Sequence, residues 1–208
     1  MAAMGTLRDE QKRIARERIL QALAVEIAEN GLLDLSVPAV AERAGVSQRT
    51  VYNYFENKDV MVSSLGEWVE DWIVERGGPS VWTDLDTIPE SLITVFSLFS
   101  EMGPLTRAVT RIRSDVARDP DIHHPRDSRS NIRTEKLRAD LAELRPDLDE
   151  DGVAAATALF RMILGMESWH WLAVGNGLSG AEAGRVAGWA FTELLDAFRA
   201  GRGPFAER

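Results

Sequence analysis

Apolar residues recur at helical spacing along almost the whole chain, and this pattern constrains the fold more than any other feature. In the stretch 7–30 they lie on one side of a helix, at Ile14, Ile19, Leu20, Leu23 and Ile27. Gly31 follows at the position of a C-cap glycine. The sequence has no alternating run typical of a strand and no internal repeat. It therefore predicts an all-α fold.

Capping residues, glycines and prolines divide the pattern into about nine helices. The predicted helices cover residues 7–30, 36–45, 47–55, 57–77, 87–103, 105–118, 130–144, 149–174 and 179–199. Two of them open with a predicted capping box, at Thr87–Glu90 and at Ser179–Glu182. Residues 119–129 contain two prolines and are predicted to form a loop.

Composition excludes several classes of protein. The chain has no cysteine, which rules out disulfides, thiolate metal sites and a cysteine nucleophile. It has no secretory h-region and no uninterrupted apolar stretch of ~18 residues, so we expect a cytoplasmic protein without a membrane partner. We also expect no cofactor and no metal. The Gly175–Gly180 segment fits a dinucleotide fingerprint but follows a helix, and Glu167–His170 is one copy of a di-iron motif that needs two.

Charge is unevenly distributed along the chain. The net charge of −9 argues against a nucleic-acid partner for the protein as a whole. Residues 1–60, however, carry eight basic and nine acidic side chains, against sixteen and twenty-four in residues 61–208. A local basic face in the first 60 residues therefore remains open.

The segment LSVPAVAERAGVSQRTVYNYFENKDVM, residues 35–61, predicts a helix-turn-helix. Two short helices meet at Gly45, where a tight turn needs positive φ, and Ala41 is small where the second helix must pass closely. The second helix presents side chains of the types that contact base edges and phosphates, with almost no acid among them. The alternative is an ordinary helical hairpin whose polar side is solvated.

The stretch AGVSQRTVYNYFENKDVM resembles the DNA-binding domain of the TetR family of bacterial repressors. That family's signature is G-V-S, then T-x-Y-x-Y/H-F, then K-[DE] at the next helix start, and the resemblance covers about residues 8–62. It implies a helix-turn-helix DNA-binding domain at residues 1–60 and a larger ligand-binding and dimerisation domain at residues 61–208. It also implies a homodimer that a bound small molecule releases from its operator.

The resemblance also implies roles for individual residues. The carried-over DNA-binding residues are Ser36, Ser47, Gln48, Arg49, Thr50, Tyr52, Asn53, Tyr54 and Lys58. The two serines would cap helices near phosphates, and the next three residues would enter the major groove. The tyrosines would meet the DNA backbone or thymine methyl groups, and the lysine would bind a phosphate. Asn53 stands where many family members carry His.

Aromatic and methionine side chains are frequent in the larger predicted domain. The expected effector-binding residues are Trp68, Trp72, Phe96, Phe99, Met102, Met162, Met166, Trp169 and His170. Flat rings and flexible thioethers suit an adaptable apolar pocket, although such residues at helical spacing also form ordinary cores. Because this lining offers few charges, we expect a small hydrophobic effector.

Small residues follow one side of the last two predicted helices. The expected dimer interface consists of Ala154, Ala158, Gly165, Gly184, Gly188, Phe191 and Leu195. Small residues let helices approach closely, so these two helices are predicted to form a four-helix bundle across a two-fold axis. The operator would then be a palindrome. The alternative is that the small residues pack within one subunit.

Together these features predict a ligand-responsive transcriptional regulator, most often a repressor in this family, and not an enzyme. The alternative is an all-α ligand carrier or enzyme with a vestigial N-terminal hairpin. The outward Arg49, Thr50, Tyr54 and Lys58 argue against it, because a vestigial surface would not stay free of acidic residues.

Overall fold

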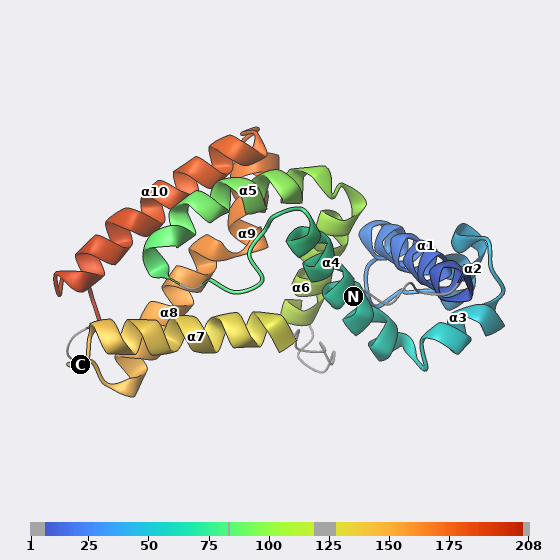
Figure 1. Ribbon diagram of the computed structural model, residues 1–208, viewed down its shortest axis with the longest axis horizontal. Helices are drawn as coiled ribbons and strands as arrows, with labels where there is room; N and C mark the ends of the chain where they lie inside the picture. Colours follow the sequence, from blue (N-terminus) through green and yellow to red (C-terminus); the bar gives the residue numbers. More distant parts are fainter. Residues whose placement is uncertain (1–6, 83, 119–127, 206–208) are drawn as a thin grey trace. The chain divides into compact units, whose positions relative to one another are not determined.

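The computed structural model describes residues 7–82, 84–118 and 128–205, and the described chain is almost entirely helical (Figure 1). The α-helices are α1 (Leu7–Asn30), α2 (Val37–Ala44), α3 (Gln48–Tyr54), α4 (Lys58–Glu75), α5 (Ile88–Glu101), α6 (Pro104–Arg118), α7 (Ser128–Leu144), α8 (Glu150–Leu164), α9 (Met166–Trp169) and α10 (Gly180–Arg199). A 3-10 turn, η1 (Leu85–Thr87), precedes α5, and a π-helical segment, η2 (His170–Gly175), follows α9. The described residues contain no strand, so the all-α prediction is confirmed. The predicted loop at residues 119–129 lies mostly outside the described residues.

The structure has ten α-helices in its described ranges, where the sequence predicted about nine. The difference arises at Gly165, whose φ of −78° and ψ of 158° are those of extended backbone. A residue in this conformation interrupts the helical hydrogen-bond ladder. The single helix predicted for residues 149–174 is therefore divided into α8, α9 and η2.

One of the two predicted capping boxes forms. The Ser179 hydroxyl accepts a hydrogen bond from the Glu182 N–H at 3.3 Å, and the Glu182 carboxylate accepts one from the Ser179 N–H at 2.9 Å. The prediction at Thr87 is wrong. Its hydroxyl donates to the Asp84 carbonyl at 2.8 Å, because Thr87 is the last residue of η1 and already has helical dihedral angles.

The packing of the chain defines two compact units. The first comprises residues 1–69 with 104–125, and the second comprises residues 70–103 with 126–208. The first unit thus contains α1–α3, most of α4 and α6. The functional division predicted at residue 60 remains a prediction, since these units describe packing alone.

The core of the first unit forms around α1, which packs against α2 and α6. Ile19, Leu23 and Ile27 of α1 are completely buried, as the apolar stripe predicted. Val40 of α2 and Val51 of α3 are also buried, and they fix the face of each short helix that turns inward.

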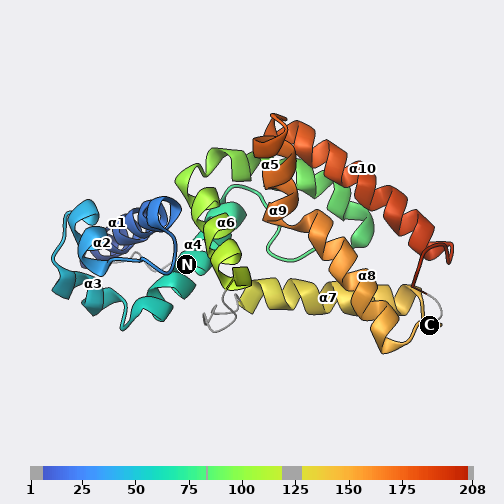
Figure 2. The ribbon, with the colours of Figure 1, turned by 180° about the vertical axis from the view of Figure 1, so that it is seen from behind.

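The second unit is built on the packing of α10 along α5, which Figures 1 and 2 both show. Gly180, Gly184 and Gly188 form a stripe on α10 against the backbone of α5. Further along α10, the ring of Phe160 from α8 meets the rings of Phe191 and Phe198, with centroids 5.1 and 5.8 Å apart. No helix in the described ranges is both long enough and apolar enough to cross a bilayer.

Candidate nucleic-acid interface

The turn between α2 and α3 has the geometry that a helix-turn-helix requires. The Ser36 hydroxyl caps α2 by accepting from the Ala39 N–H at 3.3 Å. Gly45 ends that helix with φ 68° and ψ 34°, a left-handed conformation that glycine adopts without steric cost. The N–H of Gly45 donates to Glu42 and that of Val46 to Ala41, so the last carbonyls of α2 are satisfied.

The start of α3 is capped by the second predicted serine. The Ser47 hydroxyl accepts from the Thr50 N–H at 3.1 Å and lies 2.8 Å from the Thr50 hydroxyl. These bonds fix the direction of the first turn of α3. The remaining backbone N–H groups of that turn are at the positive end of the helix dipole, which favours an anion.

The two sides of α3 differ in burial. Val51 and Phe55, at the end of the helix, are buried in the first unit. The residues Gln48, Arg49, Tyr52 and Asn53 are exposed, whereas Thr50 and Tyr54 are half-buried. The exposed residues are one, three and one positions apart, so they share one side of the helix. None of them is acidic, and Arg49 forms no ion pair with a described residue.

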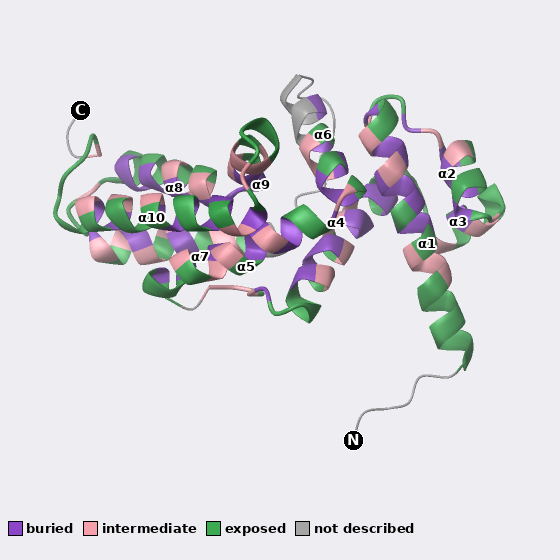
Figure 3. Cartoon of the chain, turned by 90° about the horizontal axis from the view of Figure 1, so that it is seen from above, coloured by how far each residue is buried: buried purple, intermediate pink, exposed green. Residues whose placement is uncertain are grey.

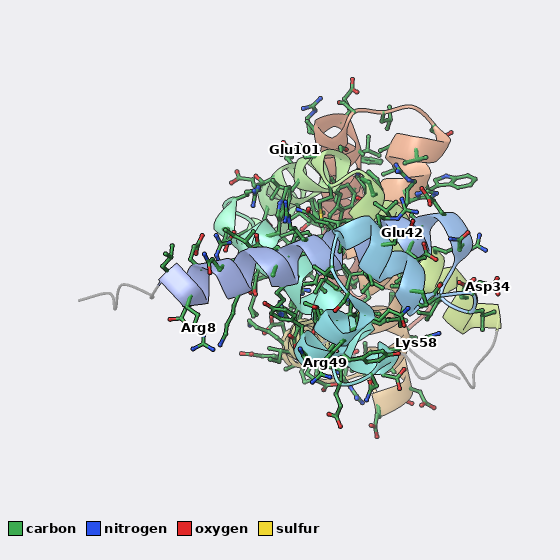
Figure 4. The ribbon with its side chains drawn as sticks, turned by 90° about the vertical axis from the view of Figure 1, so that its right-hand side faces the viewer. Arg8, Asp34, Glu42, Arg49, Lys58 and Glu101 are labelled. Atoms are coloured by element: carbon green, nitrogen blue, oxygen red, sulfur yellow. The ribbon has the colours of Figure 1, made fainter. Side chains whose placement is uncertain are left out.

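Lys58 lies at the first position of α4 and has a partner inside the domain. Its ammonium donates a hydrogen bond of 2.6 Å to the Leu35 carbonyl, just before α2. A lysine ammonium carries three N–H donors, so two remain for another ligand. Figure 4 labels Lys58 and Arg49 in a view of this end of the chain.

Another basic residue near the turn is neutralised. The guanidinium of Arg43 lies 2.7 Å from the Glu29 carboxylate and 3.7 Å from that of the buried Glu26. Arg43 therefore joins α2 to α1 within the domain. Arg49 on the exposed side of α3 differs from Arg43 in having no ion pair with a described residue.

The predicted effector residues are only partly brought together. The rings of Phe96 and Phe99 stack at 5.8 Å, and Phe99 meets the edge of Trp169 at 6.0 Å. The Trp169 indole N–H donates to the Ser100 hydroxyl at 3.0 Å. Met102 and Met166 are also buried.

The other predicted effector residues are placed differently. Met162 is 62% exposed, so it does not line a buried apolar site. Trp68 and Trp72 are half-buried, and the Arg76 guanidinium lies 4.0 Å from the Trp72 ring. His170 is half-buried beside Trp169, with ring centroids 6.1 Å apart.

Two hollows in the described surface lie elsewhere. One, of about 500 Å³, is lined by residues of α1 and α2 that include Arg18 and Glu42. The other, of about 360 Å³, lies between α7 and the start of α8 and includes Arg138 and Glu150. Neither is lined by a predicted effector residue, and both are edged by charged side chains.

Most of the predicted dimer interface is used within the chain. A Cβ on Gly184 would lie 2.6 Å from Ile93 Cα, and one on Gly188 would lie 2.8 Å from the Pro89 carbonyl oxygen. Gly165, Phe191 and Leu195 are also buried. The small residues of α10 therefore serve its contact with α5 within the chain, and the dimer interface stays a prediction. Ala154 and Ala158 on α8 are exposed.

Sequence reasoning missed Arg16. Its guanidinium lies 5.5 Å from the ring centroid of Phe55, the residue that ends α3. A cation over an aromatic face at this distance is an attractive contact. The spacing of Arg8, Lys12 and Arg16 four residues apart is the signal that could have identified it.

Comparison with known proteins shows what this domain resembles. Residues 19–65 match the sequence model of the tetR family of bacterial regulatory proteins. This part of the chain is therefore similar to the N-terminal domain of that family. This TetR-family match covers α2, α3, the second half of α1 and the first part of α4, and it confirms the resemblance found in the sequence.

Relatives extend the TetR-family likeness beyond the helix-turn-helix. Nucleoid occlusion factor SlmA of Photorhabdus laumondii is 37% identical over 111 residues, which cover 51% of this chain and 56% of the relative. The protein of the same name from Escherichia coli O1:K1 is 34% identical over 103 residues, covering 48% and 52%. The chain thus matches about half the length of these relatives.

Solved structures share the fold over nearly the whole chain. A TetR-family transcription regulator from Marinobacter aquaeolei superposes with a TM-score of 0.65 at 20% identity, covering 91% of this chain and 97% of that one. A TetR-family regulator from a Rhodococcus species gives 0.61 at 19% identity, covering 88% and 99%. The TetR-type fold therefore extends through the second unit.

Proposed function

We propose that this protein is a TetR-family transcriptional regulator that binds a palindromic operator as a homodimer. One observation carries the proposal. The exposed side of α3 presents Gln48, Arg49, Tyr52 and Asn53 on a helix whose start is fixed by the Ser47 cap. A short, anchored helix with an acid-free outward face suits the major groove.

The exposed residues supply both kinds of DNA contact. Arg49 can donate two hydrogen bonds to a guanine edge, whereas Gln48 and Asn53 have the amide pairing that suits adenine. The hydroxyls of Thr50, Tyr52 and Tyr54 suit phosphate oxygens, and the tyrosine rings suit thymine methyls. The helix starts capped by Ser36 and Ser47 attract anions. Lys58 would bind a phosphate with its two remaining donors.

The dimer is proposed to form through the exposed parts of α8 and α10. Ala154, Ala158 and Met162 are exposed at four-residue spacing on α8, and Val186 and Trp189 are exposed on α10. Large apolar side chains in water favour burial against a second copy. A two-fold pair of such surfaces would present two copies of α3 to a palindrome.

Operator binding is tested by selecting duplexes from a random library with the whole protein and sequencing the bound fraction. We expect an inverted repeat to be enriched, and the enrichment to be lost with Arg49→Ala. A sequence-neutral pool would contradict the proposal. It would favour the alternative, a ligand carrier or enzyme with a vestigial hairpin.

The effector is proposed to be a small hydrophobic molecule that releases the operator, which makes the regulator a repressor. The buried cluster of Phe96, Phe99 and Trp169 supports an apolar site in the second unit. The test is to titrate the protein with a panel of apolar and charged compounds. We expect only the apolar compounds to quench tryptophan fluorescence and to release the selected duplex. Release by charged metabolites alone would contradict this part of the proposal.

A further inference from the structure

The first turns of α1 form an exposed helical extension, defined here as residues 7–18. Figure 3 shows the start of α1 as exposed, and all of residues 7–14 are exposed to solvent. The buried stripe of α1 begins only at Ile19. The helical extension therefore has little core of its own, and short helices without tertiary contacts are marginal in water.

Some of the charged residues of the helical extension pair with one another. Arg13 lies 2.6 Å from Glu10 and 2.5 Å from Glu17, so one guanidinium engages both glutamates. These contacts hold the pKa of Glu10 below its ordinary value, chiefly through the hydrogen bond from Arg13. Such pairs at three- and four-residue spacing stabilise an exposed helix.

Three of the four other basic residues of the helical extension form a separate row. Arg8, Lys12 and Arg16 are four residues apart, so they lie along one side of α1 with a rise of about 6 Å between neighbours. Arg8 and Lys12 are exposed and form no ion pair with a described residue. The helical extension carries five basic and three acidic residues, a net +2 in a chain of net −9.

The basic row leads toward the recognition helix. Its third member, Arg16, packs over the ring of Phe55, which ends α3. Lys12 and Arg8 lie one and two turns further from that contact along α1. A duplex that meets the exposed side of α3 and extends along α1 would therefore meet the exposed cations Lys12 and Arg8.

We propose that Arg8 and Lys12 bind phosphates of the duplex outside the bases that α3 reads. This inference rests on the proposed function and adds a second contact to it. Phosphate contacts carry no sequence information but add affinity that falls with salt. The helical extension would thus strengthen binding to every sequence alike.

The test uses the duplex selected by the wild-type protein, in two lengths: the selected sequence alone, and the same sequence with ten flanking base pairs on each side. Fluorescence anisotropy gives the dissociation constant between 50 and 200 mM salt for Arg8→Gln/Lys12→Gln. The matched control is Arg107→Gln/Arg202→Gln, which removes the same charge from exposed positions elsewhere.

On the long duplex we expect the first variant to lose affinity on the order of tenfold per contact at 0.1 M salt, with a salt slope shallower by about 0.9 per contact. The control and the charge-preserving Arg8→Lys/Lys12→Arg should match wild type, and the loss should shrink on the short duplex. Circular dichroism checks that the helix persists.

Equal affinity and slope for Arg8→Gln/Lys12→Gln and wild type would overturn the inference while leaving operator binding intact. An equal loss in the control variant would overturn it as well, because the effect would then be general charge. Failure of the wild-type protein to select or bind any duplex would overturn the proposed function itself, and this inference with it.

Discussion

The carboxylate of Asp115 on α6 accepts a hydrogen bond of 2.8 Å from the backbone N–H of Leu32, 83 residues earlier in the chain. Asp115 is buried, and Leu32 lies just past the end of α1, in the segment that leads to α2. The bond ties this segment to α6. The helix-turn-helix is therefore anchored at its start by a helix from a later part of the chain.

Asp115→Ala should destabilise the protein by about 1–3 kcal/mol, because it leaves a backbone N–H without its acceptor. Urea unfolding followed by circular dichroism measures the loss. Arg111→Gln is the control. The Arg111 side chain is 46% exposed and lies 3.5 Å from Asp115. Its removal keeps the bond from Leu32 to Asp115, so it should cost less than Asp115→Ala. Equal midpoints for Asp115→Ala and wild type would show that water replaces the carboxylate.

Gly184→Ala should cost about 1–3 kcal/mol, because its new methyl group would meet the backbone of α5 and force the helices apart. The same change at Gly66 in α4 is the matched control. No atom lies within 4 Å of a Cβ there, and alanine favours a helix over glycine by up to about 1 kcal/mol. We expect the thermal midpoint to fall for Gly184→Ala and to rise for Gly66→Ala.

Arg49→Ala and Lys58→Ala should weaken DNA binding in different ways. The first should cost about 1–3 kcal/mol on the selected duplex and relax its base preference at one position. The second should weaken all sequences alike and lower the salt slope by about 0.9. Anisotropy against selected and scrambled duplexes separates them. A specificity change with Lys58→Ala would reverse these assignments.

Trp189→Glu should yield monomers that no longer bind the palindrome, since a charge on the proposed α10 surface opposes its burial. Light scattering gives the mass. Trp171→Glu is the control, because Trp171 is 72% exposed on η2 and lies outside the proposed interface. Dimers of the Trp189 variant would exclude this surface.

Glu182 should contribute to the free energy of unfolding at neutral pH, and this contribution should be lost in acid. The Ser179 hydroxyl, then the Ser179 backbone N–H, lower the pKa of Glu182 from its ordinary value of 4.5. A lowered pKa in the folded state adds stability above the unfolded value, and this is lost as pH falls below 4.5 through the folded value. Glu182→Gln should therefore unfold with a weaker pH dependence below 4.5 than Glu193→Gln, measured by urea titration. The same loss of stability below pH 4.5 in both variants would contradict this prediction.

The helix-turn-helix could be predicted from the sequence because local rules determine it. Ser36, Ser47 and Gly45 act through bonds to residues at most four positions away. The partner of the glycine stripe on α10 could not be predicted in the same way. A glycine stripe indicates close helix approach but not which helix approaches, and in α10 the partner is α5 of the same chain.

The break at Gly165 and the exposure of Met162 escaped prediction for a related reason. A glycine inside a helical pattern is compatible with continuation or with a break, and tertiary packing decides between them. Met162 fits an apolar stripe by spacing, yet the structure places it on the surface. The apolar pattern predicted the number of helices better than it predicted the surroundings of each side chain.

The glycine stripe of α10 has a mechanical consequence. Gly180, Gly184 and Gly188 bring the backbones of α10 and α5 into direct contact over about two turns, where no long side chain separates them. The nearest α5 atoms at these positions are mostly backbone, so each helix has little room to shift against the other. A molecule that entered beside Phe99 would therefore displace α5 and α10 together. The resulting strain would appear at the ends of this helix pair and not at its centre.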